Sequence, residues 1–159
     1  MPDVISALQH ARSSYQPKLP KVLAENGAGV EAVEGEPLHP DSDQETIARM
    51  FANTAGLPII TFEAGTPAAA EPIKVGVILS GGQAPGGHNV IAGLFDGLQA
   101  LHADNRLFGF LGGPSGLIDG EYVEITADFV QPYRNTGGFD IIGSGRTKLE
   151  QEADFDKVA

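Results

Sequence analysis

The sequence contains no cysteine, which excludes disulfide bonds, thiol catalysis and zinc–thiolate sites. It is also poor in basic residues, with 10 lysines and arginines against 21 aspartates and glutamates, and its formal net charge is −11. Such a surplus of negative charge repels both the phosphate backbones of nucleic acids and anionic membrane surfaces. We therefore expect partners that are neither nucleic acids nor membranes.

Long apolar runs are missing as well. No stretch approaches the roughly 18 apolar residues of a membrane-spanning helix, and residues 1–15 lack the basic start and apolar run of a secretory signal peptide. These features predict a cytoplasmic protein. With 159 residues, of which 42% are hydrophobic, the chain is long and apolar enough to fold around a core.

Proline and glycine are unevenly distributed, and the change near Pro72 predicts a domain boundary. Residues 1–72 hold 8 of the 11 prolines, whereas residues 73–159 hold 16 of the 21 glycines. Proline stiffens a chain, while glycine allows positive φ angles and lets the backbone approach a ligand closely. We expect residues 1–72 to form an N-terminal extension and residues 73–159 to form the site-bearing unit, with a linker at residues 66–72.

The extension is expected to be mostly helical, with two helices and one short strand. An amphipathic pattern predicts a helix over Asp3–Tyr15. Ser42 and Glu45 have the spacing of a capping box, which predicts the start of a second helix. Residues 26–40 are interpreted as a loop, and Leu57–Phe62 as a strand.

The second half repeats the order strand, loop, helix. Apolar residues at helical spacing predict a helix over Asn89–His102, and Thr126 is placed to cap a short helix that runs to Val130. Strands are predicted at Ile73–Leu79, Leu107–Leu111, Tyr122–Ile125 and Phe139–Ile142. This order predicts an α/β fold with a parallel sheet, right-handed crossovers and flanking helices.

The first candidate site is the glycine-rich loop Gly81–Asn89, which lies between a predicted strand and a predicted helix. Glycines let backbone N–H groups come within hydrogen-bonding distance of phosphate oxygens, and the helix start adds N–H groups and a positive dipole end. The loop is neither a Walker motif nor a dinucleotide fingerprint. The alternative is a tight turn that needs glycine only for its backbone angles.

A second candidate is Gly143–Lys148, which again follows a predicted strand. Arg146 can hold a phosphate with its planar guanidinium, and Lys148 can add a point charge. The alternative is a solvated turn with surface cations. Gly112–Leu117 is equally well interpreted as a ligand loop or as a plain connection, and His88 as a helix-start residue rather than a catalytic base, since no partner carboxylate is evident.

Three spaced motifs in residues 73–150 resemble the phosphofructokinase family. They read VILSGGQAPGGHN at Val77–Asn89, GFLGGPSGL at Gly109–Leu117, and GGFD followed by GSGR at Gly137–Asp140 and Gly143–Arg146. The additional residue in the first loop and the extension before Ile73 are similar to the long, pyrophosphate-dependent branch of that family.

The resemblance implies a fold, a reaction and a set of site residues. The fold is an incomplete phosphofructokinase fold with a Rossmann-like parallel sheet. The reaction is a reversible glycolytic transfer of phosphate from pyrophosphate to the 1-hydroxyl of fructose 6-phosphate, with Mg²⁺ as cofactor, in a homo- or hetero-oligomer. The residues expected to bind the phosphate donor are Gly81, Gly82 and Arg146, and further possible ligands are Gly86, Gly87, Asn89, Ser144, Gly145 and Lys148.

Two family segments do not occur in this sequence, namely a Gly-Gly-Asp-type segment for magnesium and donor choice and a Thr-Ile-Asp-Gly-Asp-type segment with the catalytic aspartate. We therefore expect an N-terminal fragment that is inactive alone and contains no catalytic residue or metal ligand. Two alternatives stay open: a non-catalytic module that binds a phosphorylated ligand or an enzyme subunit, and a nucleotide-binding, ATP-dependent phosphofructokinase.

Overall fold

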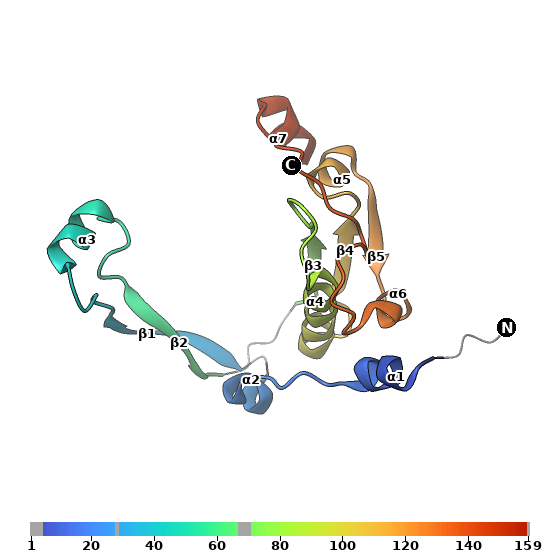
Figure 1. Ribbon diagram of the computed structural model, residues 1–159, viewed down its shortest axis with the longest axis horizontal. Helices are drawn as coiled ribbons and strands as arrows, with labels where there is room; N and C mark the ends of the chain where they lie inside the picture. The colour runs from blue at the N-terminus through green and yellow to red at the C-terminus, as the bar shows by residue number, and fades with distance from the viewer. Residues whose placement is uncertain (1–4, 28, 67–70, 159) are drawn as a thin grey trace. The chain divides into compact units, whose positions relative to one another are not determined.

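The computed structural model describes residues 5–27, 29–66 and 71–158. The chain divides into two compact units, one made of residues 18–69 and the other of residues 1–17 together with 70–159 (Figure 1). Part of the predicted linker, residues 67–70, lies outside the described residues. The predicted domain boundary at residue 72 stays a prediction.

The unit of residues 18–69 is built on a two-stranded antiparallel sheet. Strand β1 (Val30–Pro37) pairs with β2 (Pro58–Ala64), from Val30 opposite Ala64 to Pro37 opposite Pro58. Helix α2 (Lys21–Asn26) lies at one end of this hairpin and α3 (Gln44–Met50) at the other (Figure 1). None of the buried hydrophobic side chains in the described part of the chain belongs to this unit.

Several sequence predictions for the N-terminal half need correction. Residues 26–40 are not a loop, because β1 forms there by pairing with a strand more than twenty residues away. The extension therefore holds three helices and two strands in its described part. Helix α3 is preceded by Asp43 in a left-handed conformation, φ 55°, without a side-chain cap, so the capping box expected from Ser42 is absent there. The strand at Leu57–Phe62 is confirmed as β2.

Helix α1 (Ala7–Ser14) belongs to the other unit and confirms most of the first predicted helix. Its capping box consists of Ser6 and Gln9, whose side chains bond to each other's backbone N–H groups. Asp3, the first residue of the predicted helix, lies outside the described residues. The apolar side chains Ile5 and Leu8 are exposed.

The larger unit contains a three-stranded mixed sheet in the order β3-β4-β5. Strand β3 (Lys74–Val77) is parallel to β4 (Arg106–Phe110), and helix α4 (Gly87–Leu101) connects them. Strand β5 (Tyr122–Ile125) runs antiparallel to β4. The other elements are α5 (Pro114–Asp119), α6 (Ala127–Val130), the 3-10 turn η1 (Gln131–Tyr133) and α7 (Glu152–Val158).

The chain is thus a mixed α/β protein, but the predicted fully parallel sheet is not what the described residues form. After β4 the chain makes the short helix α5, turns at Gly120 with φ 70° and returns directly beside β4. The strand predicted at Phe139–Ile142 is not formed, although the end of this segment is hydrogen-bonded to the residues that follow β4. The carbonyl of Ile142 accepts from the N–H of Gly112 at 2.9 Å, and a single parallel bridge joins Ser80 to Gly145.

The core lies on one face of this sheet, between the strands and α4. Leu107 and Gly109 of β4 point inward, and the space above Gly109 is filled by Ile142 and Ile125. The buried cluster consists of Leu79, Ile91, Ala92, Leu98, Leu107, Ile125, Val130, Ile141 and Ile142. Strand β3 contributes only one face to the core, since Lys74 and Gly76 on its other face are exposed.

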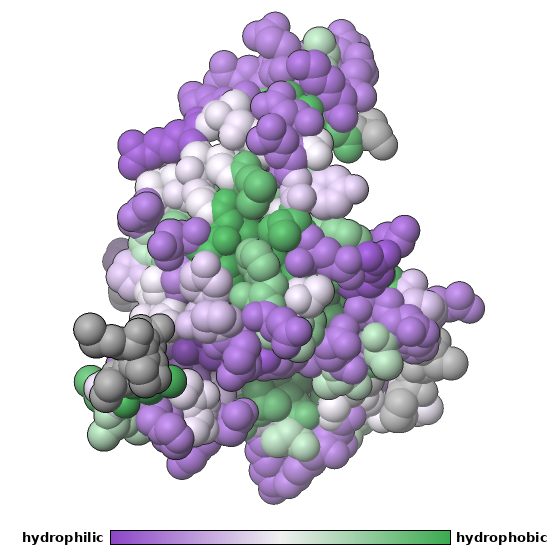
Figure 2. Space-filling model, turned by 90° about the vertical axis from the view of Figure 1, so that its right-hand side faces the viewer, coloured by the Kyte–Doolittle hydropathy of each residue, from purple (hydrophilic) through white to green (hydrophobic). Residues whose placement is uncertain are grey.

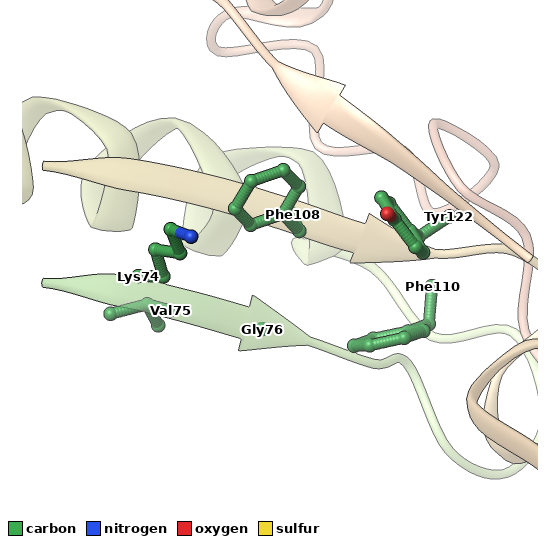
Figure 3. Close-up of a pocket in the computed structure, with 6 residues that line it drawn as sticks. All are labelled: Lys74, Val75, Gly76, Phe108, Phe110 and Tyr122. Carbon is green, nitrogen blue, oxygen red and sulfur yellow. The ribbon is translucent and has the colours of Figure 1, made fainter. Parts of the chain in front are cut away.

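Exposed hydrophobic residues form a continuous patch between hydrophilic ones on the face drawn in Figure 2. The sheet face opposite the core carries aromatic side chains. Phe108, Phe110 and Tyr122 line a pocket of 340 Å³ there, and the Phe110 ring lies against Gly76 (Figure 3). Among the described helices, none has the length and hydropathy of a transmembrane span.

Candidate phosphate-binding site

The structure brings the two predicted glycine loops into direct contact. The first loop follows β3, and its Gly81 N–H donates to the carbonyl of Gly145 at 2.8 Å. In return, the N–H of Gly145 donates to the carbonyl of Leu79 at 3.3 Å. Residues that are more than sixty positions apart in the sequence therefore form one backbone surface, as the prediction of a joint phosphate site requires.

Arg146 extends from this contact over the first loop. A Cβ atom on residue 82 would lie 2.7 Å from Nη2 of Arg146, so the guanidinium occupies space that only a glycine leaves open. Arg146 is exposed and forms no ion pair with any described residue, whereas Arg106 pairs with Glu124 and Arg134 pairs with Asp96. A guanidinium that pairs with no carboxylate in the described part of a chain of net charge −11 is available to bind an anion.

The third glycine loop packs against the second one. A Cβ atom on Gly113 would lie 2.6 Å from the nitrogen of Gly145, and a Cβ atom on Gly145 would lie 2.2 Å from the carbonyl oxygen of Gly112. Gly112 and Gly113 also have positive φ angles, 69° and 77°. Glycine is required here for close backbone packing, which favours the interpretation of this loop as a connection that supports the second loop.

The start of α4 has fewer free backbone N–H groups than the sequence suggested. The N–H of Gly86 donates to the carbonyl of Gly137 at 2.8 Å, and the N–H of His88 donates to that of Gly138 at 3.0 Å. The side-chain oxygen of Asn89 accepts from the N–H of Gly137 at 3.1 Å. The N–H groups of Gly86 and His88 are thus occupied by the turn at residues 137–138 and are not among the free N–H groups expected at the helix start.

Gly87 is required for close packing, as Gly113 and Gly145 are, because a Cβ atom there would lie 2.5 Å from the ring of Phe139. Beside it, Gln83, Ala84 and Pro85 form a pocket of 290 Å³ with residues 137–139. Lys148 is exposed and its Nζ lies 3.2 Å from Glu150, so its charge is partly compensated. Phosphate binding by Gly86, Gly87, Asn89, Ser144, Gly145 and Lys148 stays a prediction.

His88 is the residue whose position the sequence did not reveal. It is only 4% exposed, and both ring nitrogens have partners: Nδ1 lies 2.5 Å from Oγ1 of Thr136, and Nε2 accepts from the N–H groups of Asp140 and Ile141 at 3.0 and 3.1 Å. A carboxylate partner does exist, since Oδ1 of Asp140 lies 2.8 Å from Nε2. Because neither nitrogen is free, the geometry supports a structural role rather than general-base catalysis.

Comparison with known proteins finds relatives that align with nearly all of this chain. The chain is 57% identical over 152 residues to the pyrophosphate–fructose 6-phosphate 1-phosphotransferase of Porphyromonas gingivalis, covering 95% of this chain and 27% of that protein. The corresponding enzyme of Treponema pallidum is 48% identical over 165 residues, covering 98% of this chain and 29% of that protein. This chain is a homologue of the pyrophosphate-dependent phosphofructokinases. The predicted resemblance is thereby confirmed.

Plant relatives of this phosphofructokinase family are named as subunits. The β subunit from Solanum tuberosum is 43% identical, with 96% of this chain and 27% of that subunit covered, and an α subunit from Arabidopsis thaliana is 40% identical. No family model matches the sequence. The chain spans only about a quarter to three-tenths of the length of the curated relatives it matches.

The described residues of this phosphofructokinase homologue offer no cluster of metal ligands. Among them, no three histidine, aspartate or glutamate side chains lie close enough together to hold a metal ion. Mg²⁺ prefers near-octahedral coordination by carboxylate and water oxygens. Among the described residues, a metal would therefore have to be held by fewer than three such side chains, with water and phosphate oxygens as its other ligands.

Proposed function

We propose that this chain forms part of the phosphate-donor site of an enzyme that transfers phosphate reversibly from pyrophosphate to the 1-hydroxyl of fructose 6-phosphate. The names of its relatives and the identity over nearly all of the chain support this reaction. Gly81, Gly82 and Arg146 are the proposed ligands of the donor. The proposal includes Mg²⁺ bound by residues outside this chain, a larger Rossmann-like parallel sheet, an oligomeric enzyme and a cytoplasmic location.

One observation carries the proposal: the guanidinium of Arg146 lies over the side-chain-free position of Gly82. Phosphoryl transfer depends on positioning the donor and neutralising its charge, with little covalent chemistry for the protein to perform. A planar guanidinium beside an exposed glycine backbone meets both needs, since it offers a bidentate donor and a positive charge to the phosphate. The chain supplies this clamp without a catalytic aspartate segment.

The chain is therefore expected to bind pyrophosphate without phosphorylating fructose 6-phosphate. Isothermal titration of the 159-residue chain with inorganic pyrophosphate tests the binding. The substitution Arg146→Gln should weaken it about tenfold or more, because a hydrogen bond to a charged group contributes about 1.5–3 kcal/mol. Arg49→Gln in α3 makes the same charge change in the other unit and should leave binding unchanged.

The remaining outcomes separate the alternatives. Tighter binding of ATP than of pyrophosphate would favour an ATP-dependent enzyme. Equal binding by wild type and Arg146→Gln would contradict the assigned clamp. Turnover of fructose 6-phosphate by the purified chain would contradict the expectation of binding alone, and capture of an enzyme subunit without any phosphate binding would favour an interaction module.

A further inference from the structure

The buried imidazole of His88 joins two segments that are about fifty residues apart. It lies at the end of the first glycine loop, in the first turn of α4, and its ring reaches across to residues 136–141. The contacts leave no space around it, since a Cβ atom on Gly138 would lie 2.4 Å from its Cε1 and Tyr133 packs edge-on at 4.9 Å between ring centroids. A polar side chain held this tightly fixes the position of its partners.

The hydrogen-bond partners define how the ring is used. The hydroxyl of Thr136 donates to the carbonyl of Tyr133 at 2.6 Å, so its oxygen accepts from Nδ1–H of His88. That leaves Nε2 with a lone pair, which receives the N–H groups of Asp140 and Ile141. Were Nε2 protonated instead, it would donate to the nearby Asp140 carboxylate, whose side chain is 77% exposed. In either state the ring is bound to Asp140.

The segment that His88 holds leads directly into the Arg146 loop. The N–H of Gly143 donates to the carbonyl of Asp140 at 3.3 Å, and Gly145 then makes its two hydrogen bonds with Gly81 and Leu79. Ile141 and Ile142 are buried between these points. Because no regular strand stabilises residues 139–142, the two N–H groups bound by Nε2 replace part of the missing ladder.

We propose that His88 is a positioning residue for anion binding, which holds residues 139–146 so that Arg146 lies over Gly82. The inference rests on the proposed function of Arg146. His88 does not touch the anion and acts through the loop. Its loss should loosen the loop, weaken binding of inorganic pyrophosphate, and do so only when Arg146 is present.

Two substitutions separate the roles of the ring nitrogens. His88→Asn keeps a donor near Thr136 but lacks an acceptor at the position of Nε2. His88→Gln can place its amide oxygen near that position and accept from Asp140 and Ile141. We expect His88→Asn to bind inorganic pyrophosphate about tenfold more weakly. Substitution of residues that orient the ligands of a bound metal has an effect of this size. His88→Gln should recover most of the affinity.

A double-mutant cycle distinguishes positioning from a general loss of structure. If His88 acts through Arg146, then adding His88→Asn to Arg146→Gln should cause no further loss of pyrophosphate affinity. Hydrogen exchange of residues 139–146 should be faster in His88→Asn than in wild type. The matched control is His102→Asn at the far end of α4, where the histidine is partly exposed, and it should change neither quantity.

Specific results would overturn the inference. The first is a folded His88→Asn variant that binds pyrophosphate with wild-type affinity. The second is a loss of pyrophosphate affinity on His88→Asn that is equal with and without Arg146. The third is hydrogen exchange of residues 139–146 that His88→Asn leaves unchanged. If His88→Asn does not fold, Thr136→Val removes the acceptor of Nδ1 and must show the same two effects at smaller size, or the inference fails. If wild type itself binds no pyrophosphate, the proposed function fails and this inference fails with it. If wild type binds pyrophosphate but His88→Asn leaves the exchange of residues 139–146 unchanged, only the positioning role of His88 is overturned.

Discussion

Glycine has two different roles among the loops of this chain. At Gly82 the missing side chain makes room for the flexible end of Arg146, so the site depends on the space. At Gly145 and Gly113 the missing side chain lets two backbones touch, so the fold depends on it. The same residue type in similar loops thus has separable consequences for binding and for stability, and single substitutions can distinguish them.

Gly82→Ala should weaken pyrophosphate binding while leaving the fold intact. The new methyl group would lie 2.7 Å from Nη2 of Arg146 and would displace the guanidinium, which can move because it ends a flexible side chain. We expect an affinity loss of about two- to fivefold, the equivalent of one imperfect hydrogen bond. Titration with pyrophosphate and a thermal melt check it, and a lowered melting temperature with unchanged affinity would contradict it.

Gly145→Ala should destabilise the fold instead. Its methyl group would lie 2.2 Å from the carbonyl oxygen of Gly112, and backbone on both sides must shift to admit it. Overpacking of this kind costs about 1–3 kcal/mol of unfolding free energy. Urea denaturation measures the effect. The control is Gly93→Ala in α4, which meets no atom within 4 Å and should gain about 0.5–1 kcal/mol from helix propensity.

At the level of elements, α1 is attached to the larger unit through Asn135. This residue has φ 55°, and its Nδ2 donates to the carbonyls of Arg12 and Tyr15 at 2.9 and 2.8 Å. These carbonyls belong to the C-terminal end of α1, and that of Arg12 also accepts from the N–H of Tyr15. One side-chain amide therefore both caps the helix and holds it beside the turn that precedes the candidate site.

Asn135→Gly should release α1 without disturbing the turn. Glycine tolerates the positive φ angle but lacks the amide, so only the two hydrogen bonds to α1 are lost. We expect amide protons of residues 7–14 to exchange at least several-fold faster, since a helix of this length is marginal alone. Exchange in α4 serves as the internal reference, and unchanged protection of α1 would show that Asn135 does not hold it.

The strand pair β4–β5 contains an ion pair with a defined pH response. Arg106 hydrogen-bonds to Glu124, and this bond together with the positive charge lowers the pKa of the Glu124 carboxyl. A carboxyl whose pKa is lowered on folding adds stability above its unfolded pKa and loses it as the pH falls through the folded value. The contribution is thus present at neutral pH and lost below about pH 4.3.

Glu124→Gln should therefore be less stable than wild type at pH 7 and equally stable in acid. The difference is expected to shrink as the pH falls below about 4.3, when the wild-type carboxyl also becomes neutral. Urea denaturation across this pH range measures it. Glu121→Gln makes the same charge change on a residue without an ion pair in the described part of the chain, and an identical pH profile for both variants would contradict the assignment.

At the scale of the whole molecule, the two units differ in how they are stabilised. The larger unit has a buried cluster of nine hydrophobic residues around β4 and α4. In residues 18–66 no described hydrophobic side chain is buried, and Ile59, Ile60 and Phe62 of β2 are all about half exposed or more. A two-stranded hairpin without a core is marginally stable in water.

The two units should therefore open independently in the isolated chain. Amide protons of β1 and β2 are expected to exchange with solvent at least tenfold faster than those of β4 and α4, because local opening is easiest where few apolar contacts hold the backbone. Hydrogen exchange followed by mass spectrometry resolves the two sets. Equal protection in both would mean that the hairpin is stabilised by contacts comparable to those of the core.

Much of the larger unit could be predicted from local patterns. Helix α4 and strands β4 and β5 follow from apolar periodicity, and Thr126 caps α6 as its position suggested, accepting from the N–H of Phe129. Strand β1 could not be predicted, because its acidic sequence has little strand signal until it pairs with β2. The antiparallel return of β5 depends on the turn at Gly120 rather than on periodicity.

The sequence by itself determined which loops are rich in glycine, which residues are cationic beside them, and which family they resemble, because these are properties of composition and order. Only the tertiary structure decided that Gly81 meets Gly145, that Arg146 lies over Gly82, and that the ring of His88 receives two distant N–H groups. Each of these contacts joins residues more than fifty positions apart, and such distances are closed by packing of the core rather than by local preference.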